Sequence, residues 1–315
     1  MAEMQAQREI WGQTLAELGG VYPNLIVLDG DLANSCRSEL FDFAYPDRFF
    51  EMGIAEQNMM GVAAGFATLG FIPWLSSFSV FLVKRALDQL RVVVAQPNLS
   101  VKLGGGYSGL LTSKTGKTHQ SVQDLSVMRS MPNMTVIAPA DGPELRSAMY
   151  AVMERPGPAY VRLYREVTPV LFGKDEKFEI GKARVVREGT DLTIISTHVQ
   201  TVRALEAADM LAKDGISAHV LHVPTLKPLD EDAIVAAAKK TGLVLTTEEH
   251  TIIGGLGSAV SEVLSQRQPT LMKINGLNDV YGESGGPDAL LEKYGVSSNK
   301  VAAAAKQLLG TRVGV

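Results

Sequence analysis

A carboxylate opens an apolar stretch in the first part of the chain. Glu56 lies in the segment Gly53-Ile54-Ala55-Glu56-Gln57-Asn58, and residues 54–69 have the length and composition of a buried helix. Two interpretations of Glu56 are open. A carboxylate in the first turn is stabilised by the positive end of the helix dipole, which is a structural role. A carboxyl group kept from water can instead share a proton with a ring nitrogen of a bound cofactor, which is a catalytic role.

Aromatic and imidazole side chains follow at two further turns. Phe78 and Phe81 are three residues apart where a strand is expected to turn into a helix, so both rings can face one side and sandwich a flat heterocycle. The alternative is that both belong to the core. His119 is the only histidine in the first half, and it closes a loop rich in Gly, Ser and Thr that runs from residue 104. Such a histidine can exchange protons near neutral pH, or it can simply be solvated.

Basic and hydroxyl side chains at strand ends could bind an anion. Arg162 and Arg165 end one expected strand, and alternation places them on opposite faces, so one of them can reach the crevice beyond the sheet. Ser35 and Arg37 follow another strand end and could join the same site. His250 also lies at the carboxyl end of a strand, and its role stays open.

The elements that must position these side chains alternate between strand and helix. In the first half the sequence predicts strands at 25–28, 71–75, 99–103, 135–138 and 159–163, with helices at 4–19, 54–69, 78–94 and 142–153. In the second half it predicts strands at 192–196, 217–222, 243–247 and 271–274, with helices at 201–213, 230–239, 256–266 and 297–309. This alternation indicates the α/β fold class, with two doubly wound, mostly parallel-sheet domains of which the second is smaller.

The composition changes between residues 172 and 189, where Lys, Glu and Gly dominate and apolar periodicity fades. We therefore predict a first domain over residues 1–171, a linker over 172–189 and a second domain over 190–315. Two glycine runs, Gly104-Gly105-Gly106 and Gly254-Gly255-Leu256-Gly257, lack the spacing of a dinucleotide-binding turn. This disfavours a dehydrogenase.

Charge and composition exclude several classes of protein. The formal net charge of the 315 residues is −4, and Lys and Arg are dispersed, so nucleic acid and anionic membranes are not expected partners. Cys36 is the single cysteine, which rules out an internal disulfide and favours a reducing compartment. No apolar run approaches the roughly 18 residues of a membrane helix, and residues 1–9 do not resemble a signal peptide. We expect a cytoplasmic protein that does not bind membranes.

Taken in order, these segments resemble the C-terminal portion of transketolase. The likeness covers nearly the whole chain, and the joint order and spacing of the motifs are more specific than any one of them. The motifs are Asp31-Leu32, Gly53-Ile54-Ala55-Glu56-Gln57-Asn58, Phe78-Ser79-Val80-Phe81, Thr118-His119-Gln120, Arg165, Glu248-Glu249-His250 and Gly254-Gly255-Leu256-Gly257. The resemblance implies a pyrimidine-binding domain followed by a transketolase C-terminal domain, with thiamine diphosphate and a divalent cation such as Mg²⁺ as cofactors.

The resemblance also implies roles for individual side chains. Glu56 would hydrogen-bond the pyrimidine ring nitrogen and so activate the cofactor, and His119 would assist proton movement on the substrate. The other cofactor-binding positions would be Asp31, Leu32, Ile54, Phe78, Phe81 and Lys84. The substrate-binding positions would be Ser35, Tyr107, Thr115, His119 and Arg165, with Arg165 and Ser35 holding a sugar phosphate. The implied reaction passes a two-carbon ketol unit from a ketose to an aldose.

Half of the expected cofactor site is missing from the sequence. Full-length transketolases bind the diphosphate and metal with a Gly-Asp-Gly segment and a later Asn pair, whereas Asp29-Gly30-Asp31 stands in a different context and has no Asn partner. The resemblance therefore implies that this chain supplies no metal ligand. It implies a separate N-terminal, transketolase-like subunit that carries the diphosphate and metal site, in an α2β2 heterotetramer.

Three positions depart from the usual transketolase pattern. Thr115 replaces an aspartate that recognises a substrate hydroxyl, Tyr107 replaces a phosphate-contacting histidine, and Lys84 replaces a ring-facing tyrosine, so the donor and acceptor sugars stay open. A deoxyxylulose-phosphate synthase, which also carries a Thr-His-Gln segment, is the alternative within the same cofactor class. The chain could also be a 2-oxoacid dehydrogenase E1 beta-type subunit or a non-catalytic α/β subunit. Thr118-His119-Gln120 and residues 281–285 look closer to transketolase than to the dehydrogenase.

Overall fold

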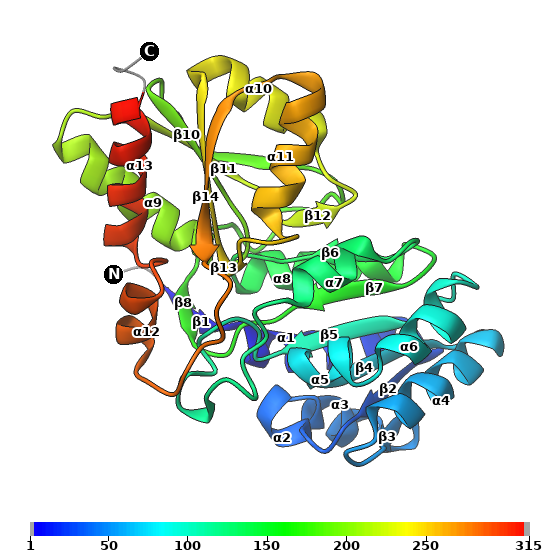
Figure 1. Cartoon of the computed structure of the whole chain (residues 1–315). Coiled ribbons are helices and arrows are strands. Elements are labelled where there is room, and N and C mark those ends of the chain that lie inside the picture. Colours follow the sequence, from blue (N-terminus) through cyan, green and yellow to red (C-terminus); the bar gives the residue numbers. More distant parts are fainter. Residues whose placement is uncertain (1–2, 312–315) are drawn as a thin grey trace.

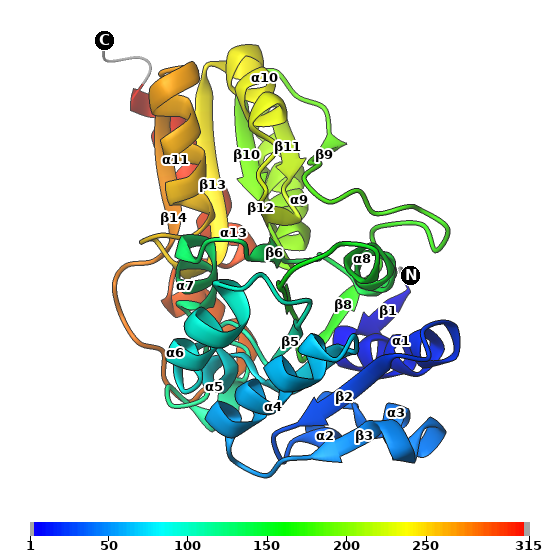
Figure 2. The same cartoon turned by 90° about the vertical axis from the view of Figure 1, so that its right-hand side faces the viewer.

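Two parallel-rich sheets organise the chain. The computed structural model describes residues 3–311, apart from the side chain of residue 113, and it places one sheet in each half of the molecule (Figure 1). The strand order is β12-β6-β7-β5-β4-β2-β3 in the first sheet and β14-β13-β10-β11-β9 in the second. Helices cover both faces of each sheet (Figure 2). The predicted fold class, two doubly wound α/β domains, is confirmed.

The first sheet has seven strands, and β12 is the strand that comes from the second half of the chain. The strands are β2 (Leu25–Asp29), β3 (Phe49–Glu51), β4 (Ile72–Phe78), β5 (Lys102–Gly106), β6 (Thr135–Ile137), β7 (Ala159–Arg162) and β12 (Thr225–Lys227). Strand β12 pairs antiparallel with β6, whereas the other neighbours in this sheet are parallel. A separate antiparallel pair joins β1 (Met4–Ala6) to β8 (Val167–Pro169).

The helices around the first sheet include several short ones. They are α1 (Gln7–Val21), α2 (Ala33–Cys36), α3 (Glu39–Ala44), η1 (Pro46–Arg48), α4 (Glu56–Thr68), α5 (Ser79–Lys84), α6 (Leu87–Gln89), η2 (Leu90–Ala95), η3 (Ser113–Thr115), α7 (Asp124–Ser130) and α8 (Gly142–Met153). Helix α1 and helix α8 pack on one face of the sheet, over a core that contains Trp11, Trp74 and Met149. Helix α4, η2 and α7 pack on the other face.

The second sheet has five strands. They are β9 (Arg184–Arg187), β10 (Leu192–Ser196), β11 (Ala218–His222), β13 (Leu243–Thr251) and β14 (Leu271–Leu277), and β9 alone is antiparallel to its neighbour. Helices α9 (Gln200–Lys213) and α13 (Ser298–Thr311) cover one face. Helices α10 (Glu231–Thr241) and α11 (Leu256–Arg267) cover the other, and α12 (Pro287–Lys293) precedes the last helix.

The glycine run 104–106 is explained by close packing. A Cβ atom at Gly104 would overlap the Trp11 ring, and one at Gly105 would overlap the Tyr160 ring on the opposite face of the sheet. Both rings are completely buried, and Trp11 meets Trp74 edge-on with 5.1 Å between ring centroids. These glycines let two large aromatic rings lie directly against strand β5. They form no phosphate-binding turn.

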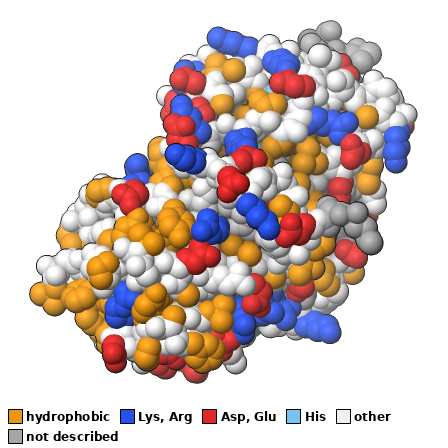
Figure 3. Space-filling model, turned by 180° about the vertical axis from the view of Figure 1, so that it is seen from behind, with side chains coloured by type: hydrophobic (Ala, Val, Ile, Leu, Met, Phe, Trp, Pro, Cys, Tyr) orange, Lys and Arg blue, Asp and Glu red, His pale blue; other side chains and the backbone are white. Residues whose placement is uncertain are grey.

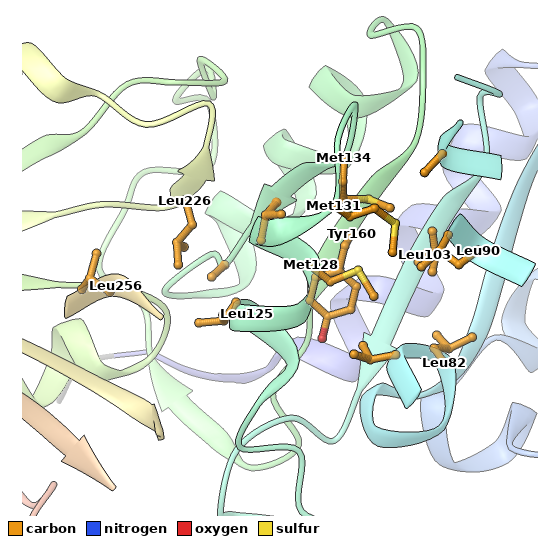
Figure 4. Close-up of a cluster of buried hydrophobic side chains, with 14 of the residues drawn as sticks. Leu82, Leu90, Leu103, Leu125, Met128, Met131, Met134, Tyr160, Leu226 and Leu256 are labelled. Atoms are coloured by element: carbon orange, nitrogen blue, oxygen red, sulfur yellow. The ribbon is translucent and has the colours of Figure 1, made fainter. Parts of the chain in front are cut away.

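One hydrophobic core runs across the junction between the two halves. Leu125 and Met128 on α7 share a cluster of buried side chains with Leu226 on β12 and Leu256 at the start of α11 (Figure 4). Burying a leucine or methionine side chain stabilises a fold by about 1.5–3 kcal/mol relative to leaving it exposed. The two domains are therefore joined by a continuous apolar interior as well as by strand β12.

Two of the differences between the observed elements and the sequence prediction have local causes. The single helix expected over 78–94 is divided into α5, α6 and a π-helical turn, η2. Apolar periodicity could not show this because a change from i→i+4 to i→i+5 hydrogen bonding hardly alters the pattern. The predicted linker 172–189 contains β9, a partly exposed edge strand of four residues. Short edge strands carry little apolar signal, so this strand was not predicted.

Candidate functional site

Glu56 is the first residue of helix α4, and its side chain is completely buried. The N-cap residue, Ala55, offers no side-chain hydrogen bond to the helix, so the carboxylate stands at a helix end that is otherwise uncapped. The nearby Glu51 fixes the approach to this helix, because one of its oxygens accepts from the backbone N–H groups of Asp31 and Gly53 at 2.9 and 2.8 Å. The carboxylate of Glu56 is thus held inside the protein by the loops around it.

Arg85 is the charged partner of Glu56. Its Nη1 atom donates to both carboxylate oxygens, at 2.8 and 2.7 Å, and its guanidinium carbon lies 4.4 Å from the centroid of the Phe81 ring. The arginine side chain is 43% exposed, whereas that of Glu56 is fully buried. The site therefore holds a flat, positively charged group that donates N–H to the acid and lies over the aromatic ring.

A cavity of about 540 Å³ opens over this pair. It brings together most of the cofactor-binding positions expected from the sequence. Its lining consists of Gly30, Asp31, Leu32, Ile54, Glu56, Phe78, Phe81, Arg85, Thr118 and His119. These residues come from the ends of β2 and β4, from the start of α4, from α5 and its C-terminal end, and from the loop after β5. The cavity therefore lies at the carboxyl edge of the parallel sheet, where α/β proteins bind ligands.

The aromatic walls of the cavity are nearly parallel. The centroids of Phe78 and Phe81 lie 5.9 Å apart with an interplanar angle of 23°, and His119 meets Phe81 edge-on at 5.4 Å. A ring inserted between two phenylalanines needs about 7 Å, twice the contact distance between carbon atoms. The two rings therefore cannot sandwich a heterocycle between them, in contrast to the expectation from their spacing. A flat ligand has to lie against one face of the pair.

Tyr107 links this wall to a second cluster of polar side chains. Its ring stacks on Phe78 with 4.1 Å between centroids, and its hydroxyl accepts a hydrogen bond of 3.0 Å from Arg8. The Arg165 guanidinium lies 5.3 Å from the Tyr107 centroid, and Arg8 also approaches the backbone oxygen of Ser35 at 3.5 Å. Two guanidinium groups therefore flank Tyr107, beside the aromatic wall of the cavity.

The sequence did not predict roles for Arg8 and Arg85. Arg8 lies near the N-terminus and Arg85 next to Lys84, and neither stands in a recognisable motif. Their partners are distant in the sequence: Arg85 is 29 residues from Glu56, and Arg8 is 99 residues from Tyr107. Charge alone could not have identified them because the same sequence holds 30 lysine and arginine residues.

Five predicted site residues do not line the described cavity. Ser35, Tyr107 and Arg165 belong to the cluster beside its aromatic wall, and Lys84 and Thr115 lie elsewhere. Lys84 donates to Gln123 and lies instead on a neighbouring cavity with Arg85 and Arg91. The Thr115 hydroxyl donates to the backbone oxygen of Thr112, within its own turn, at 3.1 Å. Their assignments as cofactor-binding and substrate-binding positions stay predictions.

Two other candidates have structural partners. Arg162, which could have faced an anion, is completely buried and pairs with Asp124 at 2.8 Å. His250, whose role was open, accepts from the backbone N–H of Ser126 at 3.3 Å and contacts the backbone oxygen of Thr251 at 2.7 Å. Arg162 also donates to the backbone oxygen of Glu249 at 3.0 Å, so both side chains link the two domains, and neither lines the cavity.

Asp29 supports the loop that forms one side of the cavity. Its two oxygens accept from the Leu32 N–H and the Ser38 hydroxyl, both at 2.6 Å. Burial raises the pKa of this carboxyl to about 6. The Asp29-Gly30-Asp31 segment is therefore anchored inward by its first aspartate and lines the cavity with its last.

Within residues 3–311, no group of three or more His, Cys, Asp or Glu side chains is arranged to hold a metal ion. None of the helices in the described part of the chain is long and apolar enough to cross a membrane. The buried acid, the aromatic wall and the loop histidine thus meet at the carboxyl edge of a doubly wound sheet, which is where α/β proteins commonly bind ligands.

Comparison with known proteins identifies the family. Residues 3–170 match the family described as "Transketolase, pyrimidine binding domain", and residues 181–301 match "Transketolase, C-terminal domain". The chain belongs to the transketolase family.

Three similar proteins are informative. A protein of Methanocaldococcus jannaschii named for a transketolase C-terminal section is 43% identical, over 95% of this chain and 94% of its own length. The 6-deoxy-6-sulfo-D-fructose transketolase subunit SqwH of Clostridium sp. (strain MSTE9) is 39% identical, over 96% of this chain and 94% of its own. A solved structure described as "Split gene transketolase, inactive beta4 tetramer" superposes with a TM-score of 0.91 at 46% identity, over 97% of this chain and 98% of its own.

Proposed function

We propose that this chain is the C-terminal subunit of a split, thiamine-diphosphate-dependent transketolase. The observation that carries the proposal is the Glu56 carboxylate, fully buried beneath a cavity with aromatic walls and already bonded to a flat N–H donor, the Arg85 guanidinium. The family matches support the same class of enzyme. The reaction proposed is transfer of a two-carbon ketol unit between sugar phosphates.

The residues around the cavity fit the aminopyrimidine half of the cofactor. The Arg85 guanidinium is a flat N–H donor that bonds both Glu56 oxygens and lies over Phe81, so the ring would have to take over at least one of these oxygens from it. Glu56 would hold a proton against the ring nitrogen at the edge of the pyrimidine, while Phe81 and Phe78 would cover one face of the ring. Ile54, Leu32 and Asp31 would border the rest of the cofactor, and Lys84 remains a further candidate. When bound, thiamine diphosphate supplies the carbon nucleophile that accepts the ketol unit.

Substrate handling is assigned to the side chains beside the aromatic wall. His119 would move a proton at a substrate hydroxyl, because it borders the cavity and its Nδ1 contacts the Thr118 hydroxyl at 2.9 Å. Arg165 and Ser35, together with Tyr107, would hold the phosphate of the sugar, and Arg8 adds a second guanidinium there. Thr115 remains a candidate contact for a substrate hydroxyl.

A partner subunit is part of the proposal. It would carry the diphosphate and most of the Mg²⁺ site, in an α2β2 heterotetramer. Large apolar side chains that are exposed on the first domain support a partner, because an unpartnered protein rarely exposes many together. They are Met4, Val21, Phe43, Ile54, Leu69, Val92, Val93 and Val167. Figure 3 shows hydrophobic side chains gathered on the half of the molecule that the first domain forms. A cytoplasmic location, expected from the single cysteine, also stays within the proposal.

Reconstitution tests the proposed function. We expect the purified chain alone to show no ketol transfer, and an equimolar mixture with an N-terminal transketolase subunit, thiamine diphosphate and Mg²⁺ to transfer a ketol unit from a ketose phosphate to an aldose phosphate. The physical reason is that this chain holds only part of the cofactor in a defined pocket. Native mass spectrometry should then show two copies of each subunit.

The same mixture distinguishes the competing enzyme classes. Condensation of pyruvate with glyceraldehyde phosphate would identify a deoxyxylulose-phosphate synthase, and acylation of a lipoyl group would identify a 2-oxoacid dehydrogenase subunit. Either result in place of ketol transfer would overturn the proposal. So would full ketol-transfer activity from a stable monomer of this chain.

A further inference from the structure

The loop that carries His119 is held by the second domain. We define this loop as residues 107–123. The carboxylate of Glu249, on strand β13, is 1% exposed, and its Oε1 atom accepts from the backbone N–H groups of Leu110 and Leu111 at 2.7 and 3.2 Å. Two successive amides of the loop are thus bonded to one charged oxygen from the other domain.

Glu249 is itself fixed by an arginine. Its second oxygen, Oε2, pairs with Nη1 of Arg203 at 3.0 Å, and Arg203 also donates to the Tyr164 hydroxyl at 3.1 Å. The arginine side chain is only 13% exposed. One carboxylate oxygen therefore faces the loop while the other is held by its own domain, which fixes the orientation of the carboxylate.

The loop is shaped to receive this oxygen. Gly109 has a φ of +80°, a conformation that side chains disfavour. A Cβ atom at this position would also overlap Oε1 of Glu249. Glycine is therefore required here on two grounds, the backbone conformation and the close approach of the carboxylate.

A second set of contacts holds the other end of the loop. Gln120, directly after His119, donates from Nε2 to the backbone oxygens of Leu110 and Glu283, both at 2.9 Å. The Ser284 hydroxyl donates to the backbone oxygen of Lys114 at 2.8 Å. The segment on either side of His119 is thus bonded to residues of the second domain.

We propose that Glu249 is a positioning residue, through which the second domain holds the His119 loop in place beside the cofactor cavity. Glu249 does not line the described cavity and acts through the loop backbone. The inference rests on the proposed function, because it gives the second domain a part in the same reaction. It assigns to that domain the placement of the substrate-binding loop.

Hydrogen exchange of the isolated chain tests the contact directly. In Glu249→Gln, one of the two side-chain oxygens becomes an NH₂ group that has to face either the loop amides or Arg203. We expect the Leu110 and Leu111 amides to exchange about 10- to 100-fold faster than in the wild type, since a hydrogen bond to a charged acceptor is lost from a locally opening loop.

Glu248→Gln is the matched control. Glu248 is the preceding residue and is also completely buried, and it accepts from the Leu256 and Gly257 amides at 2.8 Å, within the second domain. We expect this variant to leave the exchange of Leu110 and Leu111 unchanged. Equal acceleration in both variants, or none in Glu249→Gln, would overturn the proposal.

Two further variants cover the case in which Glu249→Gln folds poorly. Ser284→Ala removes one exposed contact to the loop without burying a charge, and should speed tryptic cleavage after the exposed Lys114 severalfold. Glu249→Asp keeps the negative charge and should restore part of the protection. Unchanged cleavage in Ser284→Ala, combined with exchange of the Leu110 and Leu111 amides in Glu249→Asp that is as fast as in Glu249→Gln, would contradict the role of the contacts.

Kinetics of the assembled enzyme separate this inference from the function it rests on. We expect Glu249→Gln to raise the KM for the sugar phosphate and to lower kcat, so that kcat/KM falls by about 10-fold. The affinity for thiamine diphosphate should stay as in the wild type. A wild-type assembly without ketol transfer would overturn the proposed function. An active wild type with unchanged kinetics in Glu249→Gln would overturn only the positioning role.

Discussion

Replacing Glu56 by glutamine should lower ketol transfer by the assembled enzyme at least about 100-fold. Glutamine has nearly the same shape and its oxygen can still accept from Arg85, but its amide cannot give and take a proton at a ring nitrogen. The loss of a positioned acid–base group typically costs a factor of about 10² to 10⁴. The measurement is kcat under saturating cofactor, after native mass spectrometry has shown that the variant assembles.

A surface variant controls for the change of charge. Glu17 lies on α1 and pairs with Arg146 at 2.8 Å, with both side chains more than 40% exposed. We expect Glu17→Gln to keep the wild-type rate because a solvated ion pair contributes little to stability. If Glu56→Gln retained full activity in the same assay, the chain would be a non-catalytic subunit that keeps the fold without the chemistry.

Much of the fold and part of the site were accessible from the sequence, for identifiable reasons. The helix 142–153 and the strand 192–196 were predicted at their observed boundaries, because both show clear periodicity between recognisable turns. Glu56 and Phe81 were found because each lies in the first turn of a helix, and His119 because it stands in a polar loop, each within a short motif. Parallel strands then bring these segments to one edge of the sheet.

Several of the missed features depend on partners that are distant in the chain. Arg85 reaches Glu56 across 29 residues, and strand β12 crosses from the second half of the chain to pair with β6. Strand β12 has only three residues, which is too short for a hydrophobic period to be detected in the sequence. Nothing in the sequence around Arg85 indicates which acidic side chain it will pair with. The contact of Glu249 with Leu110 spans 139 residues and belongs to the same class.

Removing the carboxylate of Asp124 should destabilise the whole chain. Asp124 and Arg162 are both completely buried, and they meet through Nε at 2.8 Å and Nη2 at 3.2 Å. The same carboxylate accepts from the Tyr160 hydroxyl at 2.8 Å, and Tyr160 in turn contacts the Ser79 hydroxyl, at the start of the helix that carries Phe81. Arg162 continues the network into the second domain by donating to the backbone oxygen of Glu249 at 3.0 Å.

In Asp124→Ala, Arg162 would remain buried without its counterion. Breaking a buried ion pair by removing one partner costs about 3–5 kcal/mol in the free energy of unfolding. For a chain of this size we expect the thermal midpoint to fall by roughly 5–10 °C in a calorimetric scan. Asp232→Asn is the contrasting variant, because its pair with Arg267 is exposed on both sides and should leave the thermal midpoint close to that of the wild type.

The double variant Asp124→Leu with Arg162→Met separates the cost of the orphaned charge from that of the lost hydrogen bonds. If the unpaired guanidinium causes the loss, the double variant should be more stable than Asp124→Ala, since buried ion pairs can be replaced by apolar side chains of similar volume at small cost. If the double variant is the less stable of the two, the bonds from Arg162 to Glu249 and from Tyr160 to Asp124 hold the domains together more than charge pairing does. A midpoint in Asp124→Ala within about 1 °C of the wild type would contradict both accounts, because each requires the buried network to stabilise the fold.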